Sequence, residues 1–132
     1  MAIDNLEFRK RERVVSQKLI DQLFNGTGSH SMAAFPIRVV YATKDLETGN
    51  EAPTQLLISV PKRHFKHAVD RNRVKRQLRE AYRHHKQIVW EAMQPRNQQL
   101  VMAFIWLSDH HLSTAEIDNR VKLLLQRIVR KL

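Results

Sequence analysis

The chain of 132 residues contains no cysteine, only three glycines and no long apolar run. Without thiols, disulfide bonds and thiolate metal sites are excluded, and a reducing compartment is compatible with the composition. Three glycines do not supply a glycine-rich phosphate loop. The longest apolar run, residues 100–107, is too short to span a bilayer, and residues 1–5 lack the pattern of a secretory signal. We therefore expect a soluble, cytoplasmic protein of one domain, with no contact to a membrane.

Acidic residues are also scarce, with 13 Asp and Glu against 23 Lys and Arg and a net charge of +10. They form no cluster suited to holding paired metal ions. His64 and His67 have the spacing of metal ligands, but the neighbouring Lys62, Arg63 and Lys66 oppose a cation and no third ligand is evident. The sequence therefore predicts neither a catalytic residue nor a metal site in this chain.

The positive charge is concentrated in residues 62–86, which hold ten cations and two acids and so carry +8 of the net +10. On a helix with about 100° per residue, this segment separates into two faces. The apolar stripe holds Val74, Leu78, Ala81, Tyr82, His85, Ile88 and Val89, and the opposite face holds Lys75, Arg76, Arg79, Arg83 and Lys86. Like-charge neighbours on a helix cost about 0.2–0.5 kcal/mol per pair, and only Glu80 offsets them. A basic face of this kind predicts a nucleic-acid partner.

Three helices are expected. Ser16 can cap a first helix that ends at Asn25-Gly26 and has an apolar face of Leu19, Ile20, Leu23 and Phe24. The basic helix is predicted to begin with Asp70 as its N-cap and to end before Pro95. A capping box, Ser113-Thr114-Ala115-Glu116, opens the last helix.

Three strands are expected between these helices. Residues 35–43 alternate with period two, and Phe35, Ile37, Val39 and Tyr41 share one face. Residues 55–60 form a second strand, which we predict to pair with the first as a hairpin across an acidic loop at 44–53. Residues 99–107 are apolar on both faces, as in a strand inside a sheet. The order of elements predicts a small α+β sandwich over residues 1–132, with residues 1–15 as a basic, flexible N-terminal arm.

A longer motif runs through the basic segment. It reads Ser59-Val60-Pro61-Lys62-Arg63, then Ala68-Val69-Asp70-Arg71-Asn72-Arg73-Val74-Lys75-Arg76, then Arg79-Glu80-Ala81-Tyr82-Arg83. This motif resembles the signature of the protein subunit of bacterial ribonuclease P. The resemblance extends over nearly the whole chain, because the order of the basic arm, short helix, strands and C-terminal helix is also similar.

The resemblance implies a fold and a function. The fold would be an α+β sandwich with a small, mostly antiparallel sheet and three helices, like the second domain of a small-subunit ribosomal protein. The subunit would bind the catalytic RNA of ribonuclease P and the 5′ leader of precursor tRNA, and would assist endonucleolytic removal of that leader. Catalysis would belong to the RNA and its Mg²⁺. We expect a monomer in a 1:1 complex with the RNA.

The residues that carry this expectation fall into two groups. The RNA-binding group is Lys62, Arg63, Arg71, Asn72, Arg73, Lys75, Arg76, Arg79 and Arg83. Phe24 and Tyr41 are predicted to offer flat surfaces to the single-stranded leader, in a cleft between the first helix and the sheet. A core role for Phe24 or Tyr41, and a helix-start role for Asn72, remain alternatives. A ribosomal-protein-like RNA binder without a nuclease role fits the basic helix equally well, and an autonomous nuclease that uses His64 or His67 fits it less well.

Overall fold

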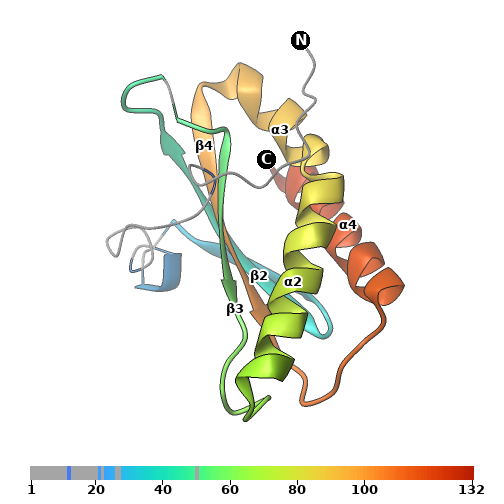
Figure 1. Cartoon of the computed structure of the whole chain (residues 1–132). Helices are drawn as coiled ribbons and strands as arrows, with labels where there is room; N and C mark the ends of the chain where they lie inside the picture. Colours follow the sequence, from blue (N-terminus) through green and yellow to red (C-terminus); the bar gives the residue numbers. More distant parts are fainter. Residues whose placement is uncertain (1–11, 13–20, 22, 26–27, 50) are drawn as a thin grey trace.

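The computed structural model describes residues 12, 21, 23–25, 28–49 and 51–132. One four-stranded sheet with three helices on one face makes up most of this part of the chain, and the helical residues 21 and 23–25 lie on the other face (Figure 1). Except for Glu12, the arm predicted for residues 1–15 lies outside the described residues, as do Ser16, Leu19 and Ile20 of the predicted first helix. The predicted α+β class is confirmed.

The sheet consists of β1 (His30–Ala34), β2 (Ile37–Asp45), β3 (Thr54–Ser59) and β4 (Gln98–Trp106), in the order β1-β2-β4-β3. β2 pairs antiparallel with both β1 and β4, whereas β3 pairs parallel with β4. The predicted hairpin between the strands at 35–43 and 55–60 is therefore wrong. β4 is apolar on both faces and takes the position between them, where both faces are covered. The hairpin partner of β2 is instead β1, a strand for which the sequence pattern gives no prediction.

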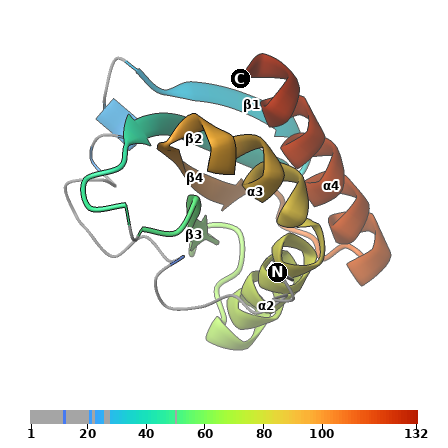
Figure 2. The same cartoon turned by 90° about the horizontal axis from the view of Figure 1, so that it is seen from above.

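The basic segment forms two helices, α2 (Ala68–His85) and α3 (Gln87–Met93), followed by the 3₁₀ turn η2 (Gln94–Arg96). α4 (Thr114–Lys131) closes the fold beside α2 on the same face of the sheet (Figure 2). α2 begins after His67, so the prediction that Asp70 is its N-cap is wrong. Asp70 instead lies in the first turn of α2, where a carboxylate interacts favourably with the helix dipole. The predicted cap of α4 is confirmed, because the Ser113 hydroxyl accepts a hydrogen bond from the Glu116 amide.

The main core lies between the sheet and α2, α3 and α4. Its fully buried members include Tyr82, Leu78, Phe104 and Trp106, and α4 contributes Ile117, Val121, Leu124, Leu125 and Ile128. The other face of the sheet, which we call the outer face, buries a much smaller cluster of Leu23, Val40, Val101 and Ala103. Within the described residues, no helix has both the length and the apolar content of a membrane span. Packing in the main core therefore fixes α2 in place and leaves the opposite side of this helix exposed to solvent.

Candidate nucleic-acid interface

Burial along α2 follows the predicted stripe. Val74, Leu78, Ala81 and Tyr82 are buried against the sheet and α4. The Tyr82 hydroxyl is hydrogen-bonded to the Thr54 hydroxyl of β3, which also accepts a bond from the Trp90 indole at 2.9 Å. Burial raises the pKa of Tyr82 far above its ordinary value, so this hydroxyl stays neutral. These contacts hold α2 in one orientation and determine which of its residues face solvent.

The predicted RNA-binding cations, on α2 and the loop before it, differ in what they contact. Six of them form no hydrogen bond or ion pair with any residue that the structure describes: Lys62, Arg63, Arg73, Lys75, Arg76 and Arg79. All six are exposed except Lys75, which is half-buried. Asn72, one position before Arg73, is exposed, and its side chain likewise has no hydrogen-bond partner in the described part of the chain. Cations of this kind, on one rigid helix and the loop before it, can neutralise phosphates without first breaking internal ion pairs.

The remaining predicted cations have structural partners. Arg71 donates to the backbone carbonyls of Phe65 and Lys66 at 2.9 and 3.0 Å and so ties α2 to the preceding loop. Arg83 forms a two-point ion pair with Glu80, with distances of 3.0 and 2.8 Å. The hydrogen bond from Arg83 is the main reason why the pKa of Glu80 lies below its ordinary value. Arg71 and Arg83 therefore have less freedom to meet a phosphate than the other six cations.

The predicted place of Lys86 on the cationic face is wrong. Its side chain is buried where α2 meets α3, and its Nζ lies 2.9 Å from Glu12 Oε1. Nζ also lies 4.7 Å from the centre of the Trp90 ring. The helix is interrupted at this position, between α2 and α3.

Phe24 and Tyr41 lie on opposite faces of the sheet, so the prediction that they share one cleft is wrong. Tyr41 pairs with Met102 and belongs to the main core, with 4% of its surface exposed. Val40, which precedes Tyr41 in β2, lies on the outer face of the sheet and packs with Leu23. Phe24 follows Leu23 and is 45% exposed, which removes the alternative of a purely core role. Strand alternation explains this outcome, because neighbouring residues of β2 point to opposite faces.

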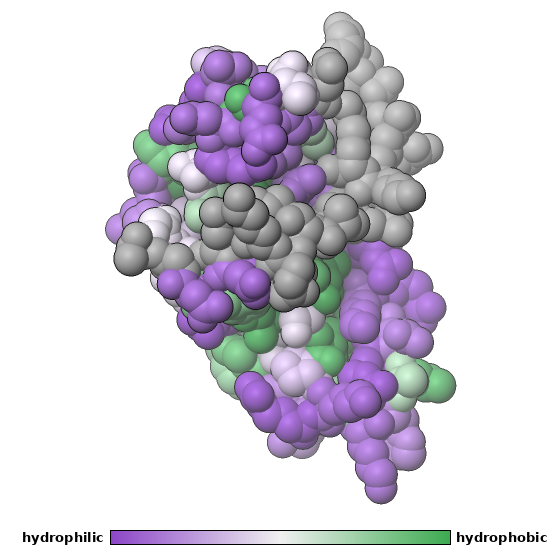
Figure 3. Space-filling model, turned by 90° about the vertical axis from the view of Figure 1, so that its left-hand side faces the viewer, coloured by the Kyte–Doolittle hydropathy of each residue, from purple (hydrophilic) through white to green (hydrophobic). Residues whose placement is uncertain are grey.

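The outer face offers a small apolar surface around Leu23, the residue before Phe24. Ala42, Leu57 and Ile105 are only partly buried there and pack against the cluster of Leu23, Val40, Val101 and Ala103. Figure 3 shows this side of the molecule, where apolar surface lies open between regions of hydrophilic surface. Exposed aromatic rings are the type of surface on which unpaired bases stack.

The histidines link α2 and the loop before it to the C-terminal part of the chain. His64 Nδ1 donates to Asp109 at 2.8 Å, and His111 Nε2 donates to Asp70 at 3.0 Å. His84 and His85 both reach Asp118 of α4, at 3.3 and 2.8 Å. These partners lie 33 to 45 residues apart in sequence, so no local pattern predicts them. Among the described residues, no three His, Asp or Glu side chains come together as a possible metal site.

Comparison with known proteins gives one consistent result. The sequence profile of the family described as Ribonuclease P matches residues 8–129. A protein from Porphyromonas gingivalis named ribonuclease P protein component is 39% identical over 103 residues, which cover 76% of this chain and 70% of that protein. A relative of the same name from Chlorobaculum tepidum is 32% identical over 91 residues, or 66% of this chain and 58% of the relative.

Solved structures show the same fold. An RNase P protein mutant from Staphylococcus aureus, described as defective in mRNA degradation, superposes with a TM-score of 0.68 at 22% identity, covering 90% of this chain and 89% of the mutant. The RNase P protein from Thermotoga maritima superposes with a TM-score of 0.64 at 19% identity, covering 90% of this chain and 97% of that protein.

Proposed function

Because this chain belongs to the family of ribonuclease P protein components, we propose that it binds the catalytic RNA of ribonuclease P through the solvent face of α2. The observation that carries the proposal is the group of cations at residues 62, 63, 73, 75, 76 and 79, which have no partner among the described residues. Each cation that meets a phosphate releases condensed counterions, which gives affinity with little sequence preference. Asn72 adds a hydrogen-bonding group to this surface, and Arg71 and Arg83 add charge at its margins.

In this proposal, cleavage of precursor tRNA is the work of the RNA and its Mg²⁺. The described residues offer no group of acids or histidines that could hold two metal ions. The protein contributes positive charge, which screens the phosphates where the catalytic RNA and precursor tRNA approach each other. We expect one protein molecule per catalytic RNA.

The single-stranded 5′ leader is proposed to lie on the outer face of the sheet. Phe24 offers an exposed ring there, and Ala42, Leu57 and Ile105 offer apolar surface. Stacking on such a surface is worth about 1–3 kcal/mol per base and tolerates any sequence. Tyr41 has no part in this surface, because it lies on the other face.

A cleavage assay tests the proposed function. Precursor tRNA is incubated at low Mg²⁺ with the protein alone, with a bacterial ribonuclease P RNA alone, and with both. We expect efficient removal of the leader only when both components are present. Cleavage by the protein alone would identify an autonomous nuclease, and no effect of the protein on the RNA-catalysed reaction would contradict the proposed role.

A further inference from the structure

Two loops meet at the end of the molecule where α2 and α4 begin. One is the loop before α2, residues 61–67, which carries the exposed cations Lys62, Arg63 and Lys66. The other is the loop from β4 to α4, residues 107–113. Figure 1 shows both loops at the lower end of the molecule. Hydrogen bonds between side chains 41 and 45 residues apart in sequence hold this end of the molecule together.

His111, in the loop before α4, contacts both the loop before α2 and α2 itself. Its ring stacks on the ring of Phe65, with the ring centres 4.5 Å apart and an angle of 16° between the planes. Its Nε2 is hydrogen-bonded to Asp70, in the first turn of α2, at 3.0 Å. Phe65 is 7% exposed and belongs to the main core, so His111 stacks on a ring that is itself fixed by packing.

Two further contacts join the same parts of the chain. His64 Nδ1 lies 2.8 Å from an oxygen of Asp109, and Gln77 of α2 donates to the Leu112 carbonyl at 3.3 Å. The second ring nitrogen of His64 and of His111, and the side-chain oxygen of Gln77, are buried without a hydrogen-bond partner among the residues that the structure describes. Each of these side chains therefore depends on its bonds across the junction for its orientation. We call the contacts of His64 with Asp109, and of His111 with Phe65 and Asp70, the loop clasp.

We propose that the loop clasp holds the cations of the loop before α2 in the position in which they bind RNA. Lys62 and Arg63 directly precede His64, so a bond that fixes His64 also restricts the backbone of both cations. A loop that is ordered before binding loses less conformational entropy in the complex than one that must be ordered there. Asp109 and His111 are then positioning residues for RNA binding, an inference that rests on the proposed function.

Two double variants of equal composition test this role by equilibrium binding of ribonuclease P RNA. Asp109→Ala/His111→Ala breaks the clasp. His110→Ala/Glu116→Ala is the matched control, because both residues are exposed and neither side chain forms a hydrogen bond or ion pair within the described part of the chain. Each variant loses one acid, which by electrostatics alone favours a polyanion. We expect the clasp variant to bind about three- to tenfold more weakly than the wild type, and the control to bind at least as well. Equal affinities of the two variants would overturn the proposal.

A second background separates positioning from general damage to the fold. In Lys62→Gln/Arg63→Gln, breaking the clasp should change RNA affinity by less than about twofold, because the cations that it positions are gone. A loss of the same size in both backgrounds would overturn the positioning role. If Asp109→Ala/His111→Ala does not fold, Asp109→Ala alone carries the same comparison against Glu116→Ala, since the Asp109 side chain is 69% exposed.

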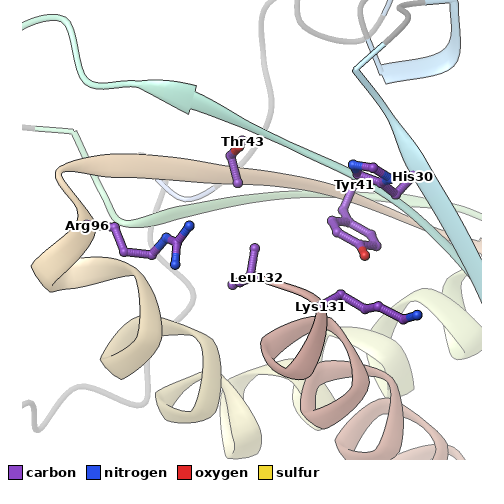
Figure 4. A pocket seen from close by; sticks show the side chains of 6 residues that line it. All are labelled: His30, Tyr41, Thr43, Arg96, Lys131 and Leu132. Carbon is purple, nitrogen blue, oxygen red and sulfur yellow. The ribbon is translucent and has the colours of Figure 1, made fainter.

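The backbone ¹⁵N heteronuclear NOE of the full-length proteins, measured without RNA, tests the clasp independently of the proposed function. Values at residues 62–66 should fall in the clasp variant and stay at the wild-type level in the control. Tyr41, Thr43 and Arg96, which line a surface cavity at the other end of α4 (Figure 4), serve as the internal reference and should not change in either variant. Unchanged values at residues 62–66 in the clasp variant would overturn the proposal, whereas failure of the wild type to bind the RNA would contradict the proposed function.

Discussion

At the scale of single residues, Lys86 is a cation of the basic segment that stabilises the fold and does not face solvent. It is 1% exposed and paired with Glu12, which is also 1% exposed. Two buried charges are tolerable only while they remain paired, because each alone would lose its hydration without compensation. The pair therefore fixes Glu12 at the junction of α2 and α3.

Replacement of this lysine should be costly. Lys86→Met breaks the buried ion pair with Glu12 and should lower the free energy of unfolding by about 3–5 kcal/mol, measured by urea denaturation. The double variant Lys86→Met/Glu12→Gln should recover part of this loss, because the remaining charge is removed. Lys122→Met is the control, since Lys122 is exposed on α4, and should change stability by no more than about 0.5 kcal/mol. Wild-type stability in Lys86→Met would show that the pair does not form in solution.

Phe24 is the single residue best suited to test leader binding. Because its ring is 45% exposed, Phe24→Ala should leave the fold intact while removing a stacking surface. The holoenzyme with this variant should bind precursor tRNA more weakly by about 1–3 kcal/mol and mature tRNA as well as the wild type does. Phe35→Ala is the matched control, because Phe35 is also exposed, at 67%, but lies at the turn between β1 and β2. Equal losses for both tRNAs would contradict a leader site at Phe24.

At the scale of elements, Asp118 connects α4 to the end of α2. Burial alone would raise the pKa of Asp118, but hydrogen bonds from His85 and His84 outweigh it and hold that pKa below its ordinary value. A carboxyl whose pKa is lower in the folded state stabilises the protein above its unfolded pKa, which is about 3.9 for Asp. This stabilisation is lost as the pH falls through the lower, folded pKa.

Asp118→Asn should therefore reduce stability at pH 7 and lose less stability than the wild type on acidification. Denaturant unfolding at pH 7, 5, 4 and 3 measures both effects. The difference between the two proteins should shrink below about pH 4. A difference that is the same at pH 3 and pH 7 would mean that Asp118 is not stabilised as an anion by the two histidines.

Elements whose signals are local could be predicted from the sequence. The stripe of α2 and the Ser113 cap of α4 depend on spacings of three and four residues, and both are confirmed. The pairing of strands was not predictable in the same way, because the apolar periodicity of a strand does not specify which other strand lies beside it in the sheet. β4 therefore separates two strands that adjoin in sequence. The break at Lys86 has no proline or glycine beside it in the sequence, and its buried ion pair involves a partner 74 residues away.

At the scale of the whole molecule, the candidate site was predictable where it depends on one helix and not where it depends on the sheet. Clustered charge alone identifies Arg73, Arg76 and Arg79, because residues 62–86 hold only two acids. The alternation with period two correctly groups Ile37, Val39 and Tyr41, but the placement of Phe35 on the same face is wrong, because Phe35 lies in the turn before β2 and is 67% exposed. The alternation also does not specify which face of the sheet the helices cover.

The central claim is that the solvent face of α2 binds the RNA of ribonuclease P. It is tested most directly by equilibrium binding of that RNA, from Porphyromonas gingivalis for example, over a range of salt concentrations. The proteins to compare are the wild type, Arg73→Gln/Arg76→Gln, and Lys122→Gln/Arg130→Gln, which loses the same charge from exposed positions of α4. The α2 variant should bind more weakly, and its slope of log affinity against log salt should be shallower by about 1 to 2 units, with unchanged folding stability. The α4 variant should keep the wild-type slope. Equal losses in the two variants, or wild-type binding by Arg73→Gln/Arg76→Gln, would contradict the claim.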